Sequence, residues 1–267
     1  MHILENIDIN YRENCLNLMQ TIYELPLNER IRTLLRLEFL FKQANYTLRG
    51  MTVWDSRFTI STLLEINNVI SRIDIQSELV KELVRQKKEF TSLASLPNID
   101  QQILNETIAS FDNVLLALNS HSKVEFNSEL LKAIQQRDSI PGGSCDFDIP
   151  IYHYWLNSQP QERIIQLETW LNLLTPFDKA TTLILNTLRD SATPEPISVD
   201  NGFYQRSLNS KSPYQLIRVG LDTNVDYYPE LSGGKHRFSI RFLQPDIEQK
   251  AVAIKSPVSF NLSCCLL

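Results

Sequence analysis

The segment SIPGGSCDFDIPIYHYWL contains three residue types that hydrolases use for nucleophilic catalysis: Cys145, Asp148 and His153. A thiol hydrolase requires a cysteine within hydrogen-bond reach of a histidine, together with a third group that orients the imidazole ring. A Cys–His thiol hydrolase centred on Cys145 and His153 is therefore one hypothesis for this chain.

The same segment also has a purely structural interpretation. Ile140-Pro141-Gly142-Gly143 fits a type II turn, because proline presets φ at the second position and glycine accepts a positive φ at the third. Asp148 precedes Ile149-Pro150 and can cap a short helix, PIYHYWL. The residues then position a histidine-bearing helix, and both hypotheses stay open at this point.

The elements around this segment divide the chain into two parts. From Pro26 to about Ala192 the apolar residues recur every three to four positions, as in LNERIRTLLRLEFLFKQ, which predicts amphipathic helices. After Pro194 and Pro196 the period drops to two, as in YQLIRVGLD and HRFSIRFLQ, which predicts strands. We predict an α+β fold, with a mostly helical N-terminal domain (19–193) followed by a small antiparallel β-domain (194–267).

The start of the chain is treated separately. Residues 1–18 are polar and acidic, and we predict a dispensable extension, with Met19 as the alternative start. The segment 19–25 alternates weakly and is predicted to be a strand that joins the β-domain.

Composition excludes several classes of function. The 267 residues are 43% apolar and 21% charged, which is typical of a soluble globular protein with a sizeable core. Seven glycines make a Gly-rich phosphate site improbable, and a net charge of −5 disfavours nucleic-acid binding. The four cysteines form no CxxC pair, so a zinc site or a disulfide framework is improbable, and we predict a reducing, cytoplasmic setting. We also expect no metal and no cofactor. No run of 18 apolar residues is present, so we expect no membrane insertion.

Five blocks of the sequence resemble one protein family. ELPLNERIRTLLRLEFLF, SIPGGSCDFDIPIYHYWL, QLETWLNLLTP, NGFYQ and GKHRFSIRF occur in the order found in the ZapD family of bacterial cell division proteins. The resemblance extends from Met19 to Cys265. It implies a cytosolic, non-enzymatic homodimer that binds the C-terminal tail of the tubulin-like protein FtsZ. A dimer has two tail sites, so it would crosslink FtsZ protofilaments into bundles and stabilise the division ring at midcell. A helical adaptor for another partner is a further alternative, beside the hydrolase.

The resemblance also implies which residues bind the tail. The basic positions of the first helix, the histidine of the short helix and the arginines of a late strand would form a positive surface. Arginine suits tail carboxylates because its fork binds them bidentately. The alternative is that these residues only keep their surfaces solvated. Glu129 stands where the family can have an arginine. The predicted FtsZ-tail binding residues are Arg36, His153, Arg241, Arg237 and Arg32.

Two further positions have specific expectations. In HRFSIRFLQ, strand alternation places Phe238, Ile240 and Phe242 on one face and the arginines on the other. Glu38 falls within the apolar face of the first helix, where an unpartnered carboxylate is costly. Lys42, one turn on, is the nearest basic partner, and a polar edge or a subunit contact is the alternative.

Overall fold

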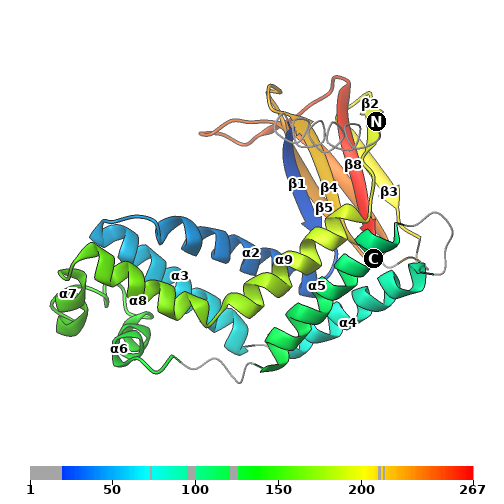
Figure 1. Cartoon of the computed structure of the whole chain (residues 1–267). Coiled ribbons are helices and arrows are strands. Elements are labelled where there is room, and N and C mark those ends of the chain that lie inside the picture. The colour runs from blue at the N-terminus through cyan, green and yellow to red at the C-terminus, as the bar shows by residue number, and fades with distance from the viewer. Residues whose placement is uncertain are drawn as a thin grey trace, which may run out of the picture. The chain divides into compact units, whose positions relative to one another are not determined.

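The chain forms two compact units in the computed structural model, which describes residues 20–72, 74–94, 100–120, 126–209, 212 and 214–266. One unit is the helical unit, Thr33–Leu185, and the other, the β unit, comprises residues up to Arg32 and from Asn186 onward. Within the described ranges, one strand is followed by the helices and then by the remaining strands of two antiparallel sheets (Figure 1), so the α+β class predicted from the sequence is confirmed. The extension 1–18 and Met19 lie outside the described residues.

The helical unit is built from amphipathic helices. In α4 (Ile75–Leu93), for example, Ile75, Leu79 and Leu83 are buried at the spacing of one helix face. The other helices follow the same pattern, and their buried side chains form the core of this unit. They are α2 (Glu29–Thr47), α3 (Val53–Arg72), α5 (Gln101–Ser120), α6 (Glu129–Arg137), α7 (Pro150–Leu156), α8 (Pro160–Asn172) and α9 (Thr175–Asp190).

Local sequence signals explain where several of these helices begin. Asp74 caps α4 by accepting a hydrogen bond from the backbone N–H of Ser77, and Ser128 caps α6 in the same way. The expectation that Asp148 caps α7 is wrong. The helix begins at Pro150 with Ile149 at the capping position, so the carboxylate of Asp148 lies one residue too early to reach the first turn.

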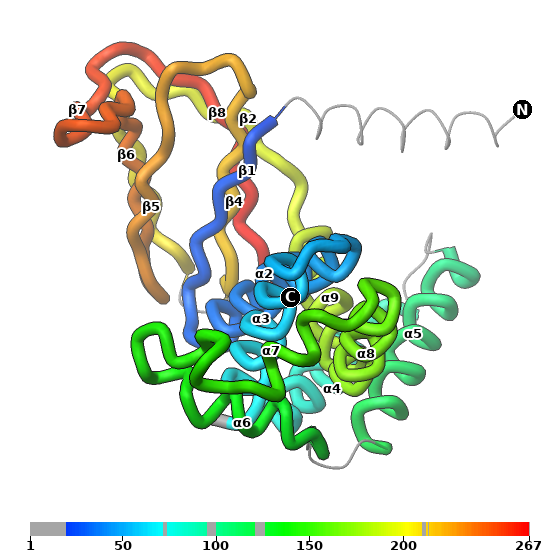
Figure 2. Tube along the Cα trace, turned by 90° about the vertical axis from the view of Figure 1, so that its left-hand side faces the viewer, coloured from blue at the N-terminus to red at the C-terminus, as the bar shows by residue number. Residues whose placement is uncertain are grey.

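The described part of the β unit contains two four-stranded antiparallel sheets, whose strands run through the upper part of Figure 2. One sheet has the order β1-β4-β8-β2 and the other the order β3-β6-β5, with β7 pairing with β6. Apolar side chains from β4, β6 and β8 form one buried cluster between these sheets. The strands are β1 (Gln20–Pro26), β2 (Glu195–Val199), β3 (Phe203–Ser207), β4 (Tyr214–Asp222), β5 (Tyr228–Gly234), β6 (Arg237–Gln244), β7 (Val252–Ala253) and β8 (Val258–Leu266).

The division between the two compact units falls inside α2 and α9. Glu24 of β1 accepts two hydrogen bonds from Arg189, at the end of α9, and one from Arg218 of β4. At the start of α2, Arg30 donates to the side chain of Gln215 of β4. These contacts assign the first turn of α2 and the last turn of α9 to the β unit. β1 itself pairs with β4 along its whole length, from Gln20 to Pro26.

Candidate functional site

The turn in the opening segment has the predicted geometry. The N–H of Gly143 donates to the carbonyl of Ile140 at 2.8 Å, and Gly142 has a φ of +72°. A residue with a side chain would be strained at that φ. The turn therefore sets the path of the chain from α6 into α7.

Arg57 of α3 connects this turn to α7. Its guanidinium donates to the backbone carbonyl of Ser144 at 2.9 Å and pairs with the carboxylate of Asp146. It also lies over the ring of Tyr152 at 4.9 Å and near the ring of Trp54 at 5.7 Å. One side chain thus fixes both the segment before α7 and the buried aromatic residue within it.

The imidazole ring of His153 has neighbours other than Cys145, the residue with which a hydrolase would need to pair it. Its Nδ1 lies 3.1 Å from Oδ2 of Asp146, and its Nε2 faces the amide nitrogen of Asn157 at 3.5 Å. Among the described residues, Cys145 makes no hydrogen bond with His153. Both ring nitrogens of His153 therefore have neighbours other than the thiol that a Cys–His hydrolase would pair with them.

Arg163 of α8 is buried and makes hydrogen bonds that stabilise the position of α7. It is 3% exposed and donates to the hydroxyl of Ser56 at 3.0 Å and to the carbonyl of Met51 at 2.9 Å. It also donates to the carbonyls of Leu156, the last residue of α7, and of Ser158, which follows the helix. These bonds join α7, the start of α3 and α8 into one arrangement.

The predicted basic residues of α2 are exposed, but their surroundings differ. Arg32 pairs with Glu29 one turn earlier, at 3.2 Å. Arg36 is exposed, and no acidic partner lies within ion-pair distance of it among the described residues. Glu129, the departure from the family pattern, is exposed on α6 and pairs with Lys132 at 2.9 Å. Arg36 is therefore the residue of this set that is most available to an anion.

The strand β6 has the predicted alternation. Phe238, Ile240 and Phe242 are buried in the core of the β unit, whereas Arg237 and Arg241 are exposed on the opposite face. The guanidinium of Arg241 lies 3.7 Å from the carboxylate of Glu230, which is its register partner on β5. Arg241 thus has a loose intramolecular partner in a solvated setting.

Two of the predicted residues lie together on one strand. Arg237 and Arg241 share one face of β6 in the β unit, whereas Arg36 and His153 come from α2 and α7 of the helical unit. Sequence reasoning missed Arg57, because 89 residues separate it from its partner Asp146. It also missed Arg163, which gives no periodic or compositional signal.

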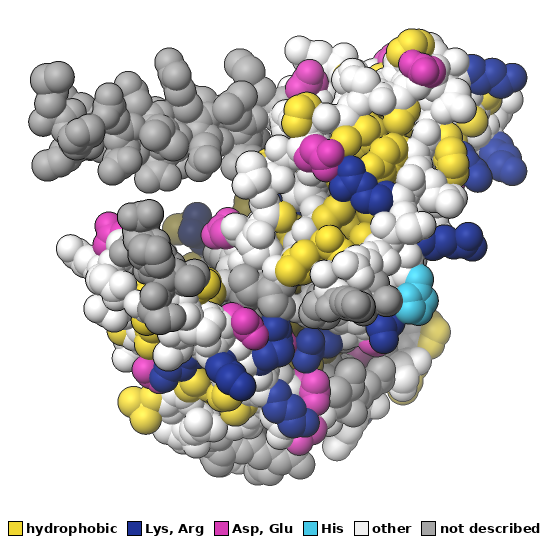
Figure 3. Space-filling model, turned by 90° about the vertical axis from the view of Figure 1, so that its right-hand side faces the viewer, with side chains coloured by type: hydrophobic (Ala, Val, Ile, Leu, Met, Phe, Trp, Pro, Cys, Tyr) yellow, Lys and Arg dark blue, Asp and Glu magenta, His cyan; other side chains and the backbone are white. Residues whose placement is uncertain are grey.

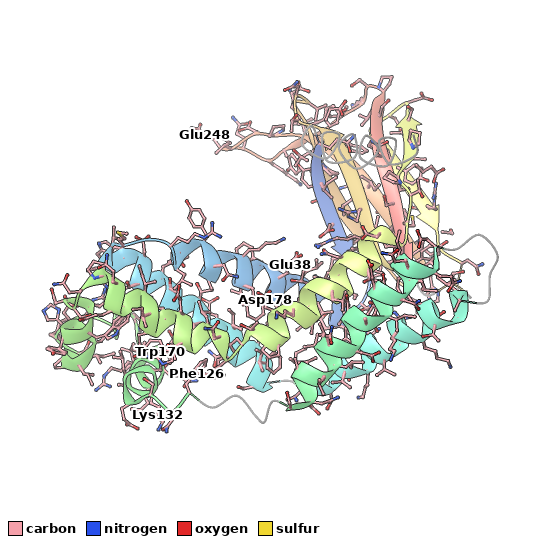
Figure 4. The ribbon with its side chains drawn as sticks, viewed as in Figure 1. Glu38, Phe126, Lys132, Trp170, Asp178 and Glu248 are labelled. Atoms are coloured by element: carbon pink, nitrogen blue, oxygen red, sulfur yellow. The ribbon has the colours of Figure 1, made fainter. Side chains whose placement is uncertain are left out.

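Glu38 has the partner expected for it. Its carboxylate is 12% exposed and lies 3.2 Å from the ammonium of Lys42. On α9, burial raises the pKa of the Asp178 carboxyl, and the negative charge of Glu38 (Figure 4) raises it further. Hydrogen bonds with Thr182 and Asn45 oppose this shift. Asp178 also lines a cavity of about 230 Å³ with Phe41, Asn45 and Glu168 among its neighbours. This is a polar edge of the helical core.

Comparisons with known proteins agree with the resemblance seen in the sequence. The model of the ZapD family, described as a cell division protein, matches residues 35–241. A cell division protein ZapD from Methylococcus capsulatus is 38% identical, over 93% of this chain and 99% of the relative. Proteins of the same name from Janthinobacterium sp. and Ralstonia nicotianae are 34% and 35% identical, over 91% of this chain and 98% of each relative.

None of the helices described is long and apolar enough to cross a membrane. Within the described ranges, no cluster of three His, Cys, Asp or Glu side chains is arranged to hold a metal ion.

Proposed function

Since this chain belongs to the ZapD family of cell division proteins, we propose that it binds the C-terminal tail of FtsZ and, as a homodimer, crosslinks FtsZ protofilaments into bundles. It acts in the cytoplasm, at the midcell division ring, and stabilises that ring. It has no catalytic activity. Crosslinking needs at least two tail sites in one particle, because a protein with a single site only decorates a filament.

The environment of Arg36 is the observation that supports this function most directly. It is an exposed cation in the helical unit, and no acidic partner lies within ion-pair distance of it among the described residues. A tail carboxylate can therefore bind it without displacing an intramolecular carboxylate. The other proposed tail-binding residues are His153, Arg241, Arg237 and Arg32. On binding the tail, Arg241 would give up its 3.7 Å contact with Glu230.

The Cys–His hydrolase remains the alternative, and Cys145 separates the two functions. The thiol of Cys145 is exposed and free. A scaffold does not need this sulfur, so the Cys145→Ser variant should bundle FtsZ like the wild type. A thiol hydrolase would lose its nucleophile and its activity in the same variant.

The proposed function is tested by cosedimentation of the purified full-length protein with FtsZ and with FtsZ that lacks its C-terminal tail. We expect bundles with the first and none with the second. Light scattering on the protein alone should show a dimer. Bundling of tail-less FtsZ would instead support an adaptor that contacts another part of the filament, and a stable monomer would remove crosslinking.

A further inference from the structure

An exposed stripe on α2 combines charge with aromatic surface. We define the α2 stripe as Arg36, Phe39, Lys42 and Tyr46, which all belong to the helical unit. Phe39 is 64% exposed and Tyr46 is 80% exposed, although both are large apolar side chains. They follow Arg36 at i+3 and i+10, spacings that repeat on one side of a helix. The opposite side of α2, with Leu34, Leu37 and Phe41, supplies the buried core.

The charge of the α2 stripe is positive. Lys42 and Glu38 neutralise one another at 3.2 Å, and Glu38 is itself largely buried. Arg36 is then the solvent-facing charge that lacks an acidic neighbour among the described residues. A partner that complements the stripe must therefore be acidic next to Arg36 and apolar next to Phe39 and Tyr46.

Several other basic side chains of the helical unit already have acidic partners. On α4, Lys81 pairs with Glu78, and Lys87 pairs with Asp112 of α5. Figure 3 shows basic and acidic side chains interspersed on the face that it presents. Around α7, Asp146 already occupies both Arg57 and His153. These surfaces attract an acidic partner less than the α2 stripe does.

We infer that the α2 stripe is the part of the FtsZ-tail site that binds an apolar side chain of the tail, beside the carboxylate held by Arg36. This inference rests on the function proposed above and specifies the ligand further. Arg36 and Phe39 are separated by about 4.5 Å along the helix axis, from a rise of about 1.5 Å per residue. An extended peptide advances about 3.3 Å per residue, so the apolar side chain lies within about two residues of the carboxylate.

The test compares single variants of the full-length protein by fluorescence anisotropy with a labelled FtsZ-tail peptide, at about 50 mM and about 300 mM salt. The variants are Arg36→Ala, Phe39→Ala and Tyr46→Ala. The matched control is Leu116→Ala on α5, because Leu116 is a similarly exposed apolar residue of the same unit. Thermal unfolding checks that each variant is folded, which the exposure of these side chains favours.

We expect Phe39→Ala to weaken binding about tenfold at both salt concentrations, because an apolar contact is not screened. Arg36→Ala should weaken binding mainly at low salt and flatten its salt dependence. Leu116→Ala should bind like the wild type. A second peptide, with the apolar residues of the tail replaced by serine, should bind the wild type about as weakly as the original peptide binds Phe39→Ala.

Two results overturn the inference and leave the proposed function standing. One is loss of binding in Arg36→Ala with wild-type binding in both aromatic variants. The other is a change in self-association, but not in peptide binding, for Phe39→Ala, which would assign the α2 stripe to a contact between copies. If the wild type fails to bind the tail peptide at all, the proposed function itself is wrong.

Discussion

The Nδ1 atom of His153 lies 3.1 Å from Oδ2 of Asp146, and the other carboxylate oxygen of Asp146 pairs with Arg57. A single exposed carboxylate thus faces two of the basic side chains near α7. It reduces the positive charge that this surface offers to an acidic peptide. The proposed tail site therefore contains an intramolecular carboxylate that competes with the carboxylates of the tail.

Removing that carboxylate should strengthen binding. In the Asp146→Asn variant, Arg57 keeps its bond to the carbonyl of Ser144 and its contact with Tyr152. The variant should lose less than about 1 kcal/mol of unfolding free energy, because the carboxylate of Asp146 is half exposed. We expect tighter binding of the FtsZ tail at low salt, measured by anisotropy. Asp148→Asn is the control, and equal effects of both variants would exclude a specific role for Asp146.

The ion pair between Arg241 and Glu230 allows the role of Arg241 in stability to be separated from its role in binding. Arg241→Glu places two carboxylates opposite one another on β5 and β6, which should cost up to about 1 kcal/mol of stability. Adding Glu230→Arg restores an ion pair with its charges exchanged. We expect the double variant to recover its unfolding free energy but to bind FtsZ more weakly than the wild type.

If the double variant recovered both its unfolding free energy and its binding to FtsZ, Arg241 would contribute only through its ion pair with Glu230. The measurement is chemical denaturation alongside cosedimentation with FtsZ at two salt concentrations. Rising salt should weaken wild-type binding as well, because the proposed contacts are between solvated charges.

Glu24 should be a strong determinant of stability in the β unit. Its carboxylate accepts hydrogen bonds from Arg189 and Arg218 at 2.9 to 3.0 Å, and all three side chains are largely buried. Glu24→Ala leaves two guanidinium groups without this partner and should cost about 3 kcal/mol. The control is Glu195→Ala, because the Arg206–Glu195 pair is more solvated and should cost less than about 1 kcal/mol. Similar losses in urea denaturation would contradict this ranking.

Arg163 should be irreplaceable by lysine. Its guanidinium donates to Ser56, Met51, Leu156 and Ser158, which lie in different directions. A lysine has one ammonium at the end of a flexible chain and cannot reach all of these acceptors. Both Arg163→Lys and Arg163→Met should lose about 3 kcal/mol or more, because buried carbonyls are left unsatisfied. A near-neutral Arg163→Lys variant in thermal unfolding would refute this account.

Asp178 should make stability depend on pH. Burial raises the pKa of its carboxyl above the ordinary value of 3.8, so between those two pKa values the folded state binds more protons than the unfolded state. The contribution of Asp178 to stability therefore falls as pH rises through this window. The stability of Asp178→Asn relative to the wild type should then increase from about pH 4 to neutral pH.

Urea denaturation at a series of pH values measures this difference. Glu168→Gln serves as the control, because Glu168 lines the same cavity but is exposed. A flat difference between Asp178→Asn and the wild type would show that the carboxyl is not held in its protonated form by the fold.

The sequence by itself determined the features that depend on near neighbours in the chain. The change of apolar period predicted helices followed by strands, because side-chain direction repeats every 3.6 residues in a helix and every 2 in a strand. The turn at Gly142, the buried face of β6 and the pairing of Glu38 with Lys42 followed from local sterics and from helix or strand geometry.

Tertiary structure alone decided which distant residues meet. Glu24 and Arg189 are 165 residues apart, and their contact moves the end of α9 into the β unit. Arg57 and Asp146 are 89 residues apart, and their contact changes the charge around His153. Charged side chains have no period that reports their partners, because an ion pair depends on where two elements pack and not on the spacing within either of them.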